Sequence, residues 1–184
     1  MECFPDIESF KRLYEAGKPQ AVYTRLVADL ETPVSAYMKL ADGRADAFLF
    51  ESVEGGAIRG RYSFVGMKPD LIWRCFGDKA QVNRRALIDP DAFEAHSLPT
   101  LDSLRSLHKE CEMEMPDSLP PMAAGLVGYM GYDCVRLVEP FPDENKDVLE
   151  VPDGIFIRPT LVAVFDSIED IVTFVTPVRP DPEI

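Results

Sequence analysis

The chain has 184 residues, 46% of them hydrophobic and 28% charged, and its formal net charge at pH 7 is −13. A chain of this size and composition can bury a core as a soluble globular protein. Its acidic balance excludes the basic face that nucleic-acid binding requires, and its sequence contains no apolar run long enough to span a membrane. We therefore expect a cytoplasmic protein that contacts neither nucleic acid nor membrane, with no signal peptide at its acidic N-terminus.

The cysteines of the chain are widely separated and form no Cys-x-x-Cys pair. They are Cys3, Cys75, Cys111 and Cys134, and only His96 and His108 could assist them as ligands. This spacing favours free thiols in a reducing cytosol over a zinc site. We predict that the chain holds no metal.

The first part of the chain predicts a helix, a strand and a second helix. Asp6 can cap a helix that has one apolar face and that ends at residues 17–19, a Gly-Lys-Pro segment. Residues 21–28 are rich in strand formers. Thr32 and Pro33 suit the cap and the first position of the second helix, and Gly43 stands where its C-terminal cap belongs.

An apolar run at Ala47–Phe50 predicts a strand that is buried on both faces. Glu51 and Ser52 follow this strand, and a glycine pair then lets the chain turn towards a second strand at residues 62–65. The two strands predict a hairpin with polar groups at its open end. The residues alone leave two interpretations open, which are a mouth that holds a small zwitterion and a solvated loop entrance.

The middle of the chain predicts a strand at residues 71–76, with Trp73 in the core, and a two-residue turn into a strand at 79–84. Residues 87–99 are polar and predict an irregular loop. Thr100 can cap a helix whose buried side carries Leu101, Leu104, Leu107 and Cys111, with His108 in solvent. Residues 113–121 contain three prolines and predict a connector.

Residues 123–133 carry a glycine at every third position, but they match no nucleotide-binding loop. We interpret them as a central strand whose glycines permit close backbone approach, followed by a helical turn at 133–138. Residues 155–165 and 168–176 predict an antiparallel hairpin joined at Asp166-Ser167. Since strands mostly adjoin strands, we predict an α+β fold with a mostly antiparallel sheet and packed helices.

The glycine-rich strand and the last hairpin are strongly apolar. We expect them to leave an apolar face exposed, because large patches of this kind mark partner surfaces. Self-association of the chain is then expected, opposed by its net charge.

Two segments near the predicted hairpin resemble the signature of anthranilate synthase component I, the chorismate-using subunit. They are Leu49-Phe50-Glu51-Ser52 and Arg61-Tyr62-Ser63-Phe64-Val65-Gly66, with Phe50 where the family has leucine. Matching segments at 32–40 and 125–133 extend the resemblance, which covers the N-terminal part of the family's protein. It implies that residues 1–178 form the N-terminal regulatory domain and that 179–184 are a linker towards a C-terminal chorismate-binding domain outside this chain.

The resemblance also implies a function. The family's protein is a lyase that makes anthranilate from chorismate in tryptophan biosynthesis, under allosteric feedback inhibition by tryptophan. The residues that the resemblance implies for the inhibitor site are Leu49, Phe50, Glu51, Ser52, Tyr62 and Ser63. It implies no catalytic, cofactor-binding or metal-binding residue here, because chorismate and Mg²⁺ bind in the C-terminal domain, so we expect the chain alone to be inactive. The implied partners are a glutamine amidotransferase subunit (component II) and the protein's own C-terminal domain.

Two alternatives remain open at this point. The first is component I of aminodeoxychorismate synthase, which belongs to the folate branch and resembles the same segments. The second is a non-catalytic module that docks a glutamine amidotransferase and senses no small molecule.

Overall fold

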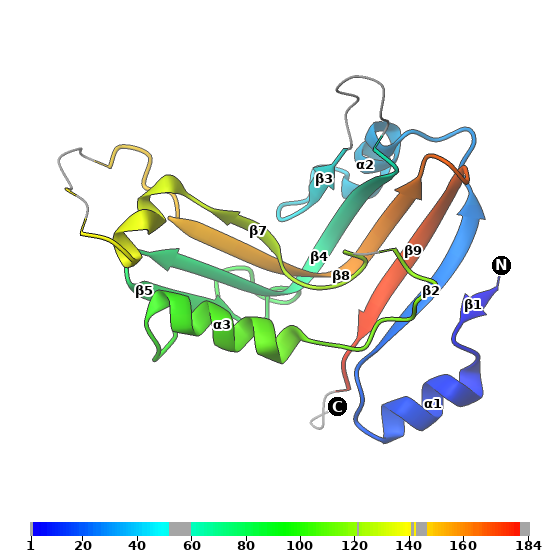
Figure 1. Ribbon diagram of the computed structural model, residues 1–184, viewed down its shortest axis with the longest axis horizontal. Coiled ribbons are helices and arrows are strands. Elements are labelled where there is room, and N and C mark those ends of the chain that lie inside the picture. Colours follow the sequence, from blue (N-terminus) through cyan, green and yellow to red (C-terminus); the bar gives the residue numbers. More distant parts are fainter. Residues whose placement is uncertain (1, 52–59, 121, 141, 143–146, 181–184) are drawn as a thin grey trace. The chain divides into compact units, whose positions relative to one another are not determined.

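A computed structural model describes residues 2–51, 60–120, 122–140, 142 and 147–180 of the chain. Its antiparallel strand pairs and its few helices confirm the predicted α+β fold (Figure 1). The chain divides into two compact units. Unit 1 comprises Met1–Lys68, Met113–Ala124 and Pro159–Ile184, and unit 2 comprises Pro69–Glu112 and Gly125–Arg158. The long strands β4 (Tyr62–Phe76) and β8 (Gly154–Asp166) contribute residues to both units.

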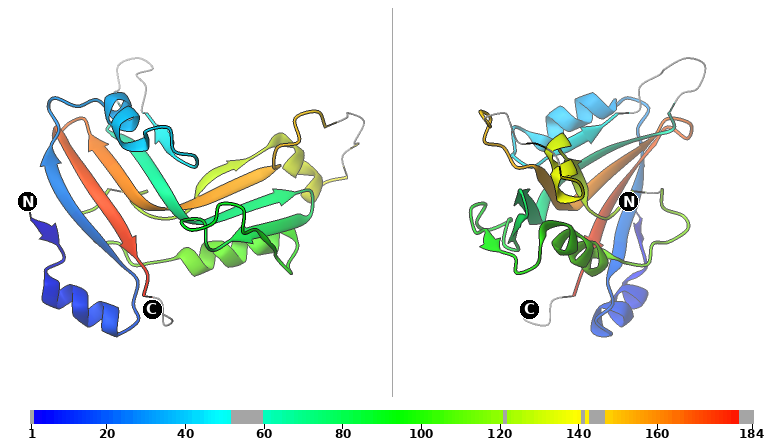
Figure 2. Two further views of the ribbon diagram at one scale, coloured as in Figure 1. Left: turned by 180° about the vertical axis from the view of Figure 1, so that it is seen from behind. Right: turned by 60° about the vertical axis from the view of Figure 1, so that its left-hand side comes forward.

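In the sheet of unit 1, β9 (Ile171–Val178) lies between β2 (Gln20–Val27) and β8, and β4 lies on the other side of β8. A short β1 (Cys3–Phe4) pairs with β2, and β3 (Phe48–Phe50) pairs with β4. The helices of this unit are α1 (Ile7–Glu15) and α2 (Pro33–Ala41). Figure 2 shows β1 and α1 beside the β2 edge of this sheet.

Both helices of unit 1 begin where the sequence predicts. The Asp6 carboxylate accepts the backbone N–H groups of Glu8 and Ser9, at 3.1 and 3.0 Å. Thr32 caps α2 in the same way, and Pro33 occupies its first turn. The end of α2 differs from the prediction by one residue, because Asp42 takes the left-handed conformation (φ 43°) immediately before Gly43.

The sheet of unit 1 is covered on both faces. Successive residues of a strand point to opposite faces, so neighbouring residues pack against different elements. Phe64, Val162 and Val164 pack against the connector that begins at Met113. Their neighbours in sequence, Val65 and Ala163, pack against α2 on the other face. The apolar run of β8 is therefore buried on both sides, as such runs usually are.

Unit 2 is built around Trp73, whose side chain is fully buried, as predicted. Its indole Nε1–H donates to Ser103 Oγ at 2.9 Å. The elements of this unit, besides parts of β4 and β8, are β5 (Lys79–Asn83), β6 (Glu94–Ala95), α3 (Thr100–Cys111), β7 (Val127–Met130) and the 3₁₀ helix η1 (Tyr132–Leu137). No helix in the described part of the chain is long and apolar enough to cross a membrane.

Several details of the predicted elements are wrong. β4 is one strand of 15 residues and not two; Lys68 takes a left-handed φ of 53° within it, but strand pairing continues beyond this residue. β3 is only partly buried, with Phe50 43% exposed. The cap of α3 is Pro99, and Thr100 instead donates its backbone N–H to Asp78 and its hydroxyl to the Gly77 carbonyl.

β7 is an edge strand and not the predicted central one, since β8 is its only partner among the described strands. The predicted close backbone approach is confirmed, because a Cβ on Gly128 would lie 1.9 Å from the Ile155 carbonyl oxygen. Tyr129 and Met130 are 45% and 37% exposed, so the expected apolar face exists here.

The final hairpin does not share in this exposed face. Its turn occupies residues 167–170, two residues longer than predicted, and Val172 and Val175 are buried. These apolar residues of the hairpin are therefore buried by cross-strand packing within unit 1. Self-association of the chain stays a prediction.

The Trp73–Ser103 bond supports a stability prediction. Ser103→Ala leaves the buried indole N–H without its acceptor, which costs about 1–3 kcal/mol. Ser106→Ala is the matched control, because Ser106 is exposed on the same helix and its loss should change stability by less than about 0.5 kcal/mol. Urea unfolding of both variants measures the difference, and equal midpoints would contradict the importance of this bond.

Candidate functional site

The predicted hairpin exists and joins β3 to the first part of β4. Phe48 pairs with Gly66, Leu49 with Val65 and Phe50 with Phe64. Glu51 is exposed at the end of β3. Ser52 lies outside the described residues, which resume at Gly60.

Aromatic contacts fix the paired part of this hairpin. A Cβ on Gly66 would come within 2.2 Å of the Phe48 ring, so only glycine lets this ring lie against β4. The rings of Phe48 and Phe50 have centroids 4.9 Å apart, and those of Tyr62 and Phe64 are 6.3 Å apart. Such distances are typical of favourable aromatic pairs.

The return of the chain into β4 is anchored by Asp166, at the end of β8. Arg61 Nε lies 3.1 and 3.0 Å from the two Asp166 oxygens, and Arg61 Nη2 lies 2.7 Å from Oδ2. The Ser167 backbone N–H donates to the Arg61 carbonyl at 2.9 Å. The arginine also lies over the Tyr62 ring, 4.9 Å from its centroid. These contacts fix the base of the hairpin mouth on a rigid strand end.

The electrostatics of this anchor favour the charged pair. Burial alone would raise the pKa of Asp166, but the hydrogen bonds from Arg61 and from the backbone N–H groups of Ile168 and Glu169 lower it below its usual value. The same bond raises the pKa of Arg61. A carboxylate so nearly buried is stable only when it is paired and hydrogen-bonded in this way.

The six residues implied for the inhibitor site divide between the two faces of the sheet. Leu49 packs on the α2 face, and Ser63, which is buried, shares that face by strand alternation. Tyr62 and Phe64 lie on the connector face, which Phe50 shares by the same alternation. Glu51 stands at the strand end, and Ser52 is outside the described residues.

Sequence reasoning missed Asp166 as a part of this site and assigned it only to a turn. Arg61 and Asp166 are separated by 105 residues, so no local pattern in the sequence connects them. The strand order does connect them, because β4 and β8 are neighbours.

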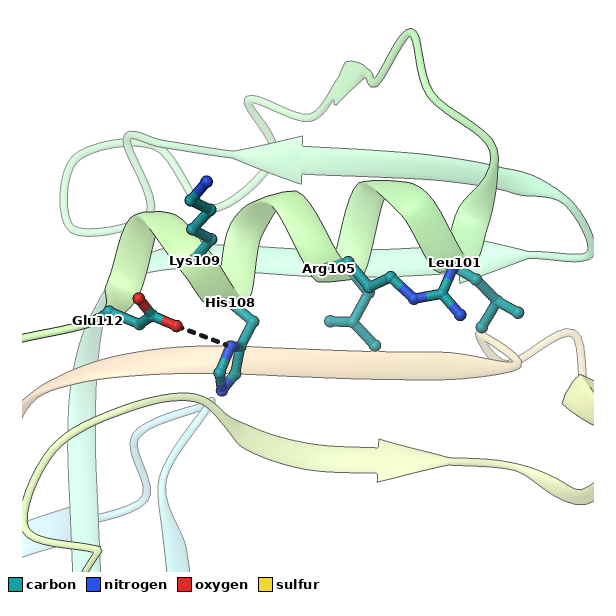
Figure 3. Close-up of a pocket in the computed structure, with 6 residues that line it drawn as sticks. Leu101, Arg105, His108, Lys109 and Glu112 are labelled. Carbon is teal, nitrogen blue, oxygen red and sulfur yellow. Dashed lines mark ion pairs between the residues drawn. The ribbon is translucent and has the colours of Figure 1, made fainter.

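A surface depression of about 520 Å³ lies along α3 (Figure 3). Its lining residues are Leu101, Leu104, Arg105, His108, Lys109 and Glu112. His108 is exposed, as predicted, and its Nδ1 lies 3.8 Å from a Glu112 oxygen. Leu101 and Leu104 are only half-buried here, in contrast to the prediction, because they border this depression.

The cysteines are free thiols. Burial, reinforced by the nearby Cys134 and Asp153, raises the pKa of Cys75 to about 12, so this thiol stays protonated at neutral pH. Within the described ranges, no group of three or more His, Cys, Asp or Glu side chains is placed to hold a metal ion.

The fold and the anchored hairpin define an α+β protein with a mostly antiparallel sheet. No protein-family model matches the chain. A crystal structure of anthranilate synthase component I from Streptococcus pneumoniae has a similar fold, with a TM-score of 0.50 and 21% identity over 86% of this chain and 32% of that chain.

Curated relatives are similar in sequence as well. "Anthranilate synthase component 1" of Cereibacter sphaeroides is 54% identical over 92% of this chain and 34% of its own length. The proteins of that name from Thermus thermophilus and a Synechocystis species are 39% and 36% identical, over 85% and 90% of this chain. Over most of its length the chain is similar to proteins named anthranilate synthase component 1, and it spans about a third of the length of these relatives.

The lowered pKa of Asp166 predicts how stability depends on pH. Above the unfolded pKa of about 4, the paired carboxylate stabilises the fold, and this contribution is lost as pH falls through the lower folded pKa. Asp166→Asn should therefore lower the unfolding free energy at pH 7 by roughly 1–3 kcal/mol, and by much less near pH 2. Urea unfolding at both pH values measures this.

Asp29→Asn is the control for that experiment, because Asp29 is exposed and no ion pair is found for it among the described residues. It should leave stability unchanged at both pH values. A deficit in Asp166→Asn that did not depend on pH would contradict the ion pair as its cause.

Proposed function

We propose that this chain supplies part of an enzyme that converts chorismate to anthranilate, and that its β3–β4 hairpin contributes to feedback inhibition by tryptophan. The observation that carries the proposal is the 54% identity, over 92% of the chain, to a protein named anthranilate synthase component 1. Because the chain spans 34% of that relative, we assign the lyase chemistry to the part of the longer protein that this chain does not cover.

The hairpin offers the chemistry that a bound amino acid needs. An ammonium group requires carboxylate or carbonyl acceptors, and the Glu51 carboxylate is exposed at the strand end. An indole ring requires apolar walls, and Phe50 is 43% exposed with its ring beside that of Phe48. The Arg61–Asp166 anchor keeps the base of the mouth in place, which reduces the entropy lost on binding.

The same proposal assigns the cofactor and the partners. Mg²⁺ and chorismate would bind in the C-terminal domain of the longer protein, and a glutamine amidotransferase subunit would supply ammonia to it. The exposed side chains of Tyr129, Met130 and Tyr132 offer an apolar surface that the rest of such a protein could cover. We propose a cytoplasmic location, in line with the free thiols.

One measurement distinguishes a tryptophan sensor from a module that only docks an amidotransferase. Titration of the longer protein with tryptophan in a calorimeter should release heat if the hairpin is part of a sensor. A module that only docks an amidotransferase would give no heat. The folate-branch alternative has no specific support, since the relatives compared above carry the name anthranilate synthase component 1.

Because we assign the lyase chemistry to the rest of the longer protein, we predict that the 184-residue chain alone makes no anthranilate. Chorismate would be supplied with ammonia or with glutamine, and anthranilate would be followed by its fluorescence. The longer protein, under the same conditions, is the positive control. Turnover by the purified chain above the blank would contradict the assignment of catalysis to the remainder of the enzyme.

The sensor assignment predicts the effect of substitutions at Ser52 in the longer protein. Ser52→Ala removes one neutral hydrogen bond of about 0.5–1.5 kcal/mol, so the inhibitory tryptophan concentration should rise roughly twofold to twelvefold. Ser52→Phe should raise it further, because its ring would occupy the space proposed for the ligand. Chorismate turnover without tryptophan should stay nearly unchanged in both variants. Inhibition curves at fixed chorismate measure this, and parental sensitivity of Ser52→Phe would rule the hairpin out as the sensor.

A further inference from the structure

A pocket of about 550 Å³ lies within unit 1, on the side of the sheet edge where β1 and α1 adjoin β2. It is formed by the start of the chain, the end of α1, the beginning of β2 and the connector after Met113. None of the residues implied for the inhibitor site lines it. In the strand order of this sheet, β9, β8 and β4 separate β2 from β3.

The walls of this pocket are apolar and partly aromatic. The rings of Phe4 and Tyr23 are stacked, with centroids 5.3 Å apart and an interplanar angle of 22°. Leu13, Pro19 and Met115 add to the apolar lining. Tyr23 is held in place by its hydroxyl, which lies 2.8 Å from Ser118 Oγ on the connector. This lining suits a flat aromatic body.

A buried amide lines the same pocket. Gln20 is only 4% exposed, and its Nε2 donates to the Phe10 carbonyl at 2.9 Å. Its Oε1 is buried, and the described part of the chain supplies no donor to it. An acceptor left unpaired in this way costs free energy, and since Oε1 is buried, a ligand donor would reach it after the Gln20 amide turns towards the pocket.

The rim of the pocket carries charges of both signs. Lys18 and Glu114 are exposed, and no ion pair is found for either among the described residues. Asp6 also lines the pocket, but its carboxylate already accepts from Ser9 and Glu8 at the start of α1. The Lys18 ammonium and the Glu114 carboxylate, which the described residues leave without an ion pair, match a ligand that is itself a zwitterion.

We propose that this pocket binds a small zwitterion whose aromatic ring carries an N–H or O–H donor. The ring would lie against Phe4 and Tyr23, with its donor directed to Gln20 Oε1. The ligand carboxylate would face Lys18, and its ammonium would face Glu114. This site is independent of the hairpin that we propose as the tryptophan sensor.

The test uses the whole chain and three soluble probes. 4-Aminophenylalanine has all the groups required, phenylalanine lacks the ring donor, and 4-aminophenethylamine lacks the carboxylate. Two-dimensional NMR titrations should show saturable shifts at Ala21 and Tyr23 with the first probe. Phenylalanine should bind about five- to twentyfold more weakly, because Gln20 Oε1 then stays unpaired. The amine should bind about two- to fivefold more weakly, as expected for an exposed charge pair.

Variants separate this site from other causes of binding. Lys18→Gln is at an exposed position and should weaken 4-aminophenylalanine about two- to fivefold. Lys11→Gln, at an exposed lysine of α1 outside the pocket, should leave its affinity unchanged. Ser52→Phe should also leave it unchanged, which separates this pocket from the hairpin. Absence of saturable shifts, equal binding of phenylalanine, or equal loss in both lysine variants would overturn the proposal.

Discussion

The buried carboxylate of Asp166 constrains three segments of unit 1 at once. It ends β8, accepts the backbone N–H groups of Ile168 and Glu169 in the turn to β9, and binds the Arg61 guanidinium at the start of β4. A charge in such a position is tolerated only with its partners in place. The turn between β8 and β9 therefore fixes the start of β4. The geometry of the candidate site thus depends on Asp166, which lies far in sequence from the motif of the β3–β4 hairpin.

Strand alternation limits what the hairpin motif can do. Leu49 and Ser63 point to the α2 face, while Phe50 and Tyr62 lie on the connector face. One ligand within the paired region cannot contact both sets. The two sets approach a common ligand only at the open end, where Glu51 stands. The paired residues would then support the mouth, and recognition would depend on the residues at the strand end.

Local chemistry in the sequence was sufficient to predict the helices and most strands. The Asp6 and Thr32 caps and the two-residue turn after β4 depend on neighbouring residues, and the structure has them where they were expected. Exposure depends on residues distant in sequence, and there some predictions failed. The apolar run that includes Phe50 predicts burial, but β3 pairs only with β4 among the described strands, and Phe50 remains partly exposed. The Arg61–Asp166 pair could not be predicted either, because its two residues are distant in sequence.

The exposed residues of β7 and η1 form a surface of unit 2 whose backbone is fixed by close packing and hydrogen bonds. Gly128 lets β7 approach β8 closely, and the Tyr129 hydroxyl donates to the Pro152 carbonyl at 2.8 Å. The Gly131 N–H and the Cys134 thiol both donate to the Asp153 carbonyl, which ties η1 to the segment before β8. Side chains carried on a backbone held in this way lose less conformational freedom when a partner covers them. An apolar edge strand with fixed backbone is thus better suited to a permanent neighbour than to transient association, which favours more polar surfaces.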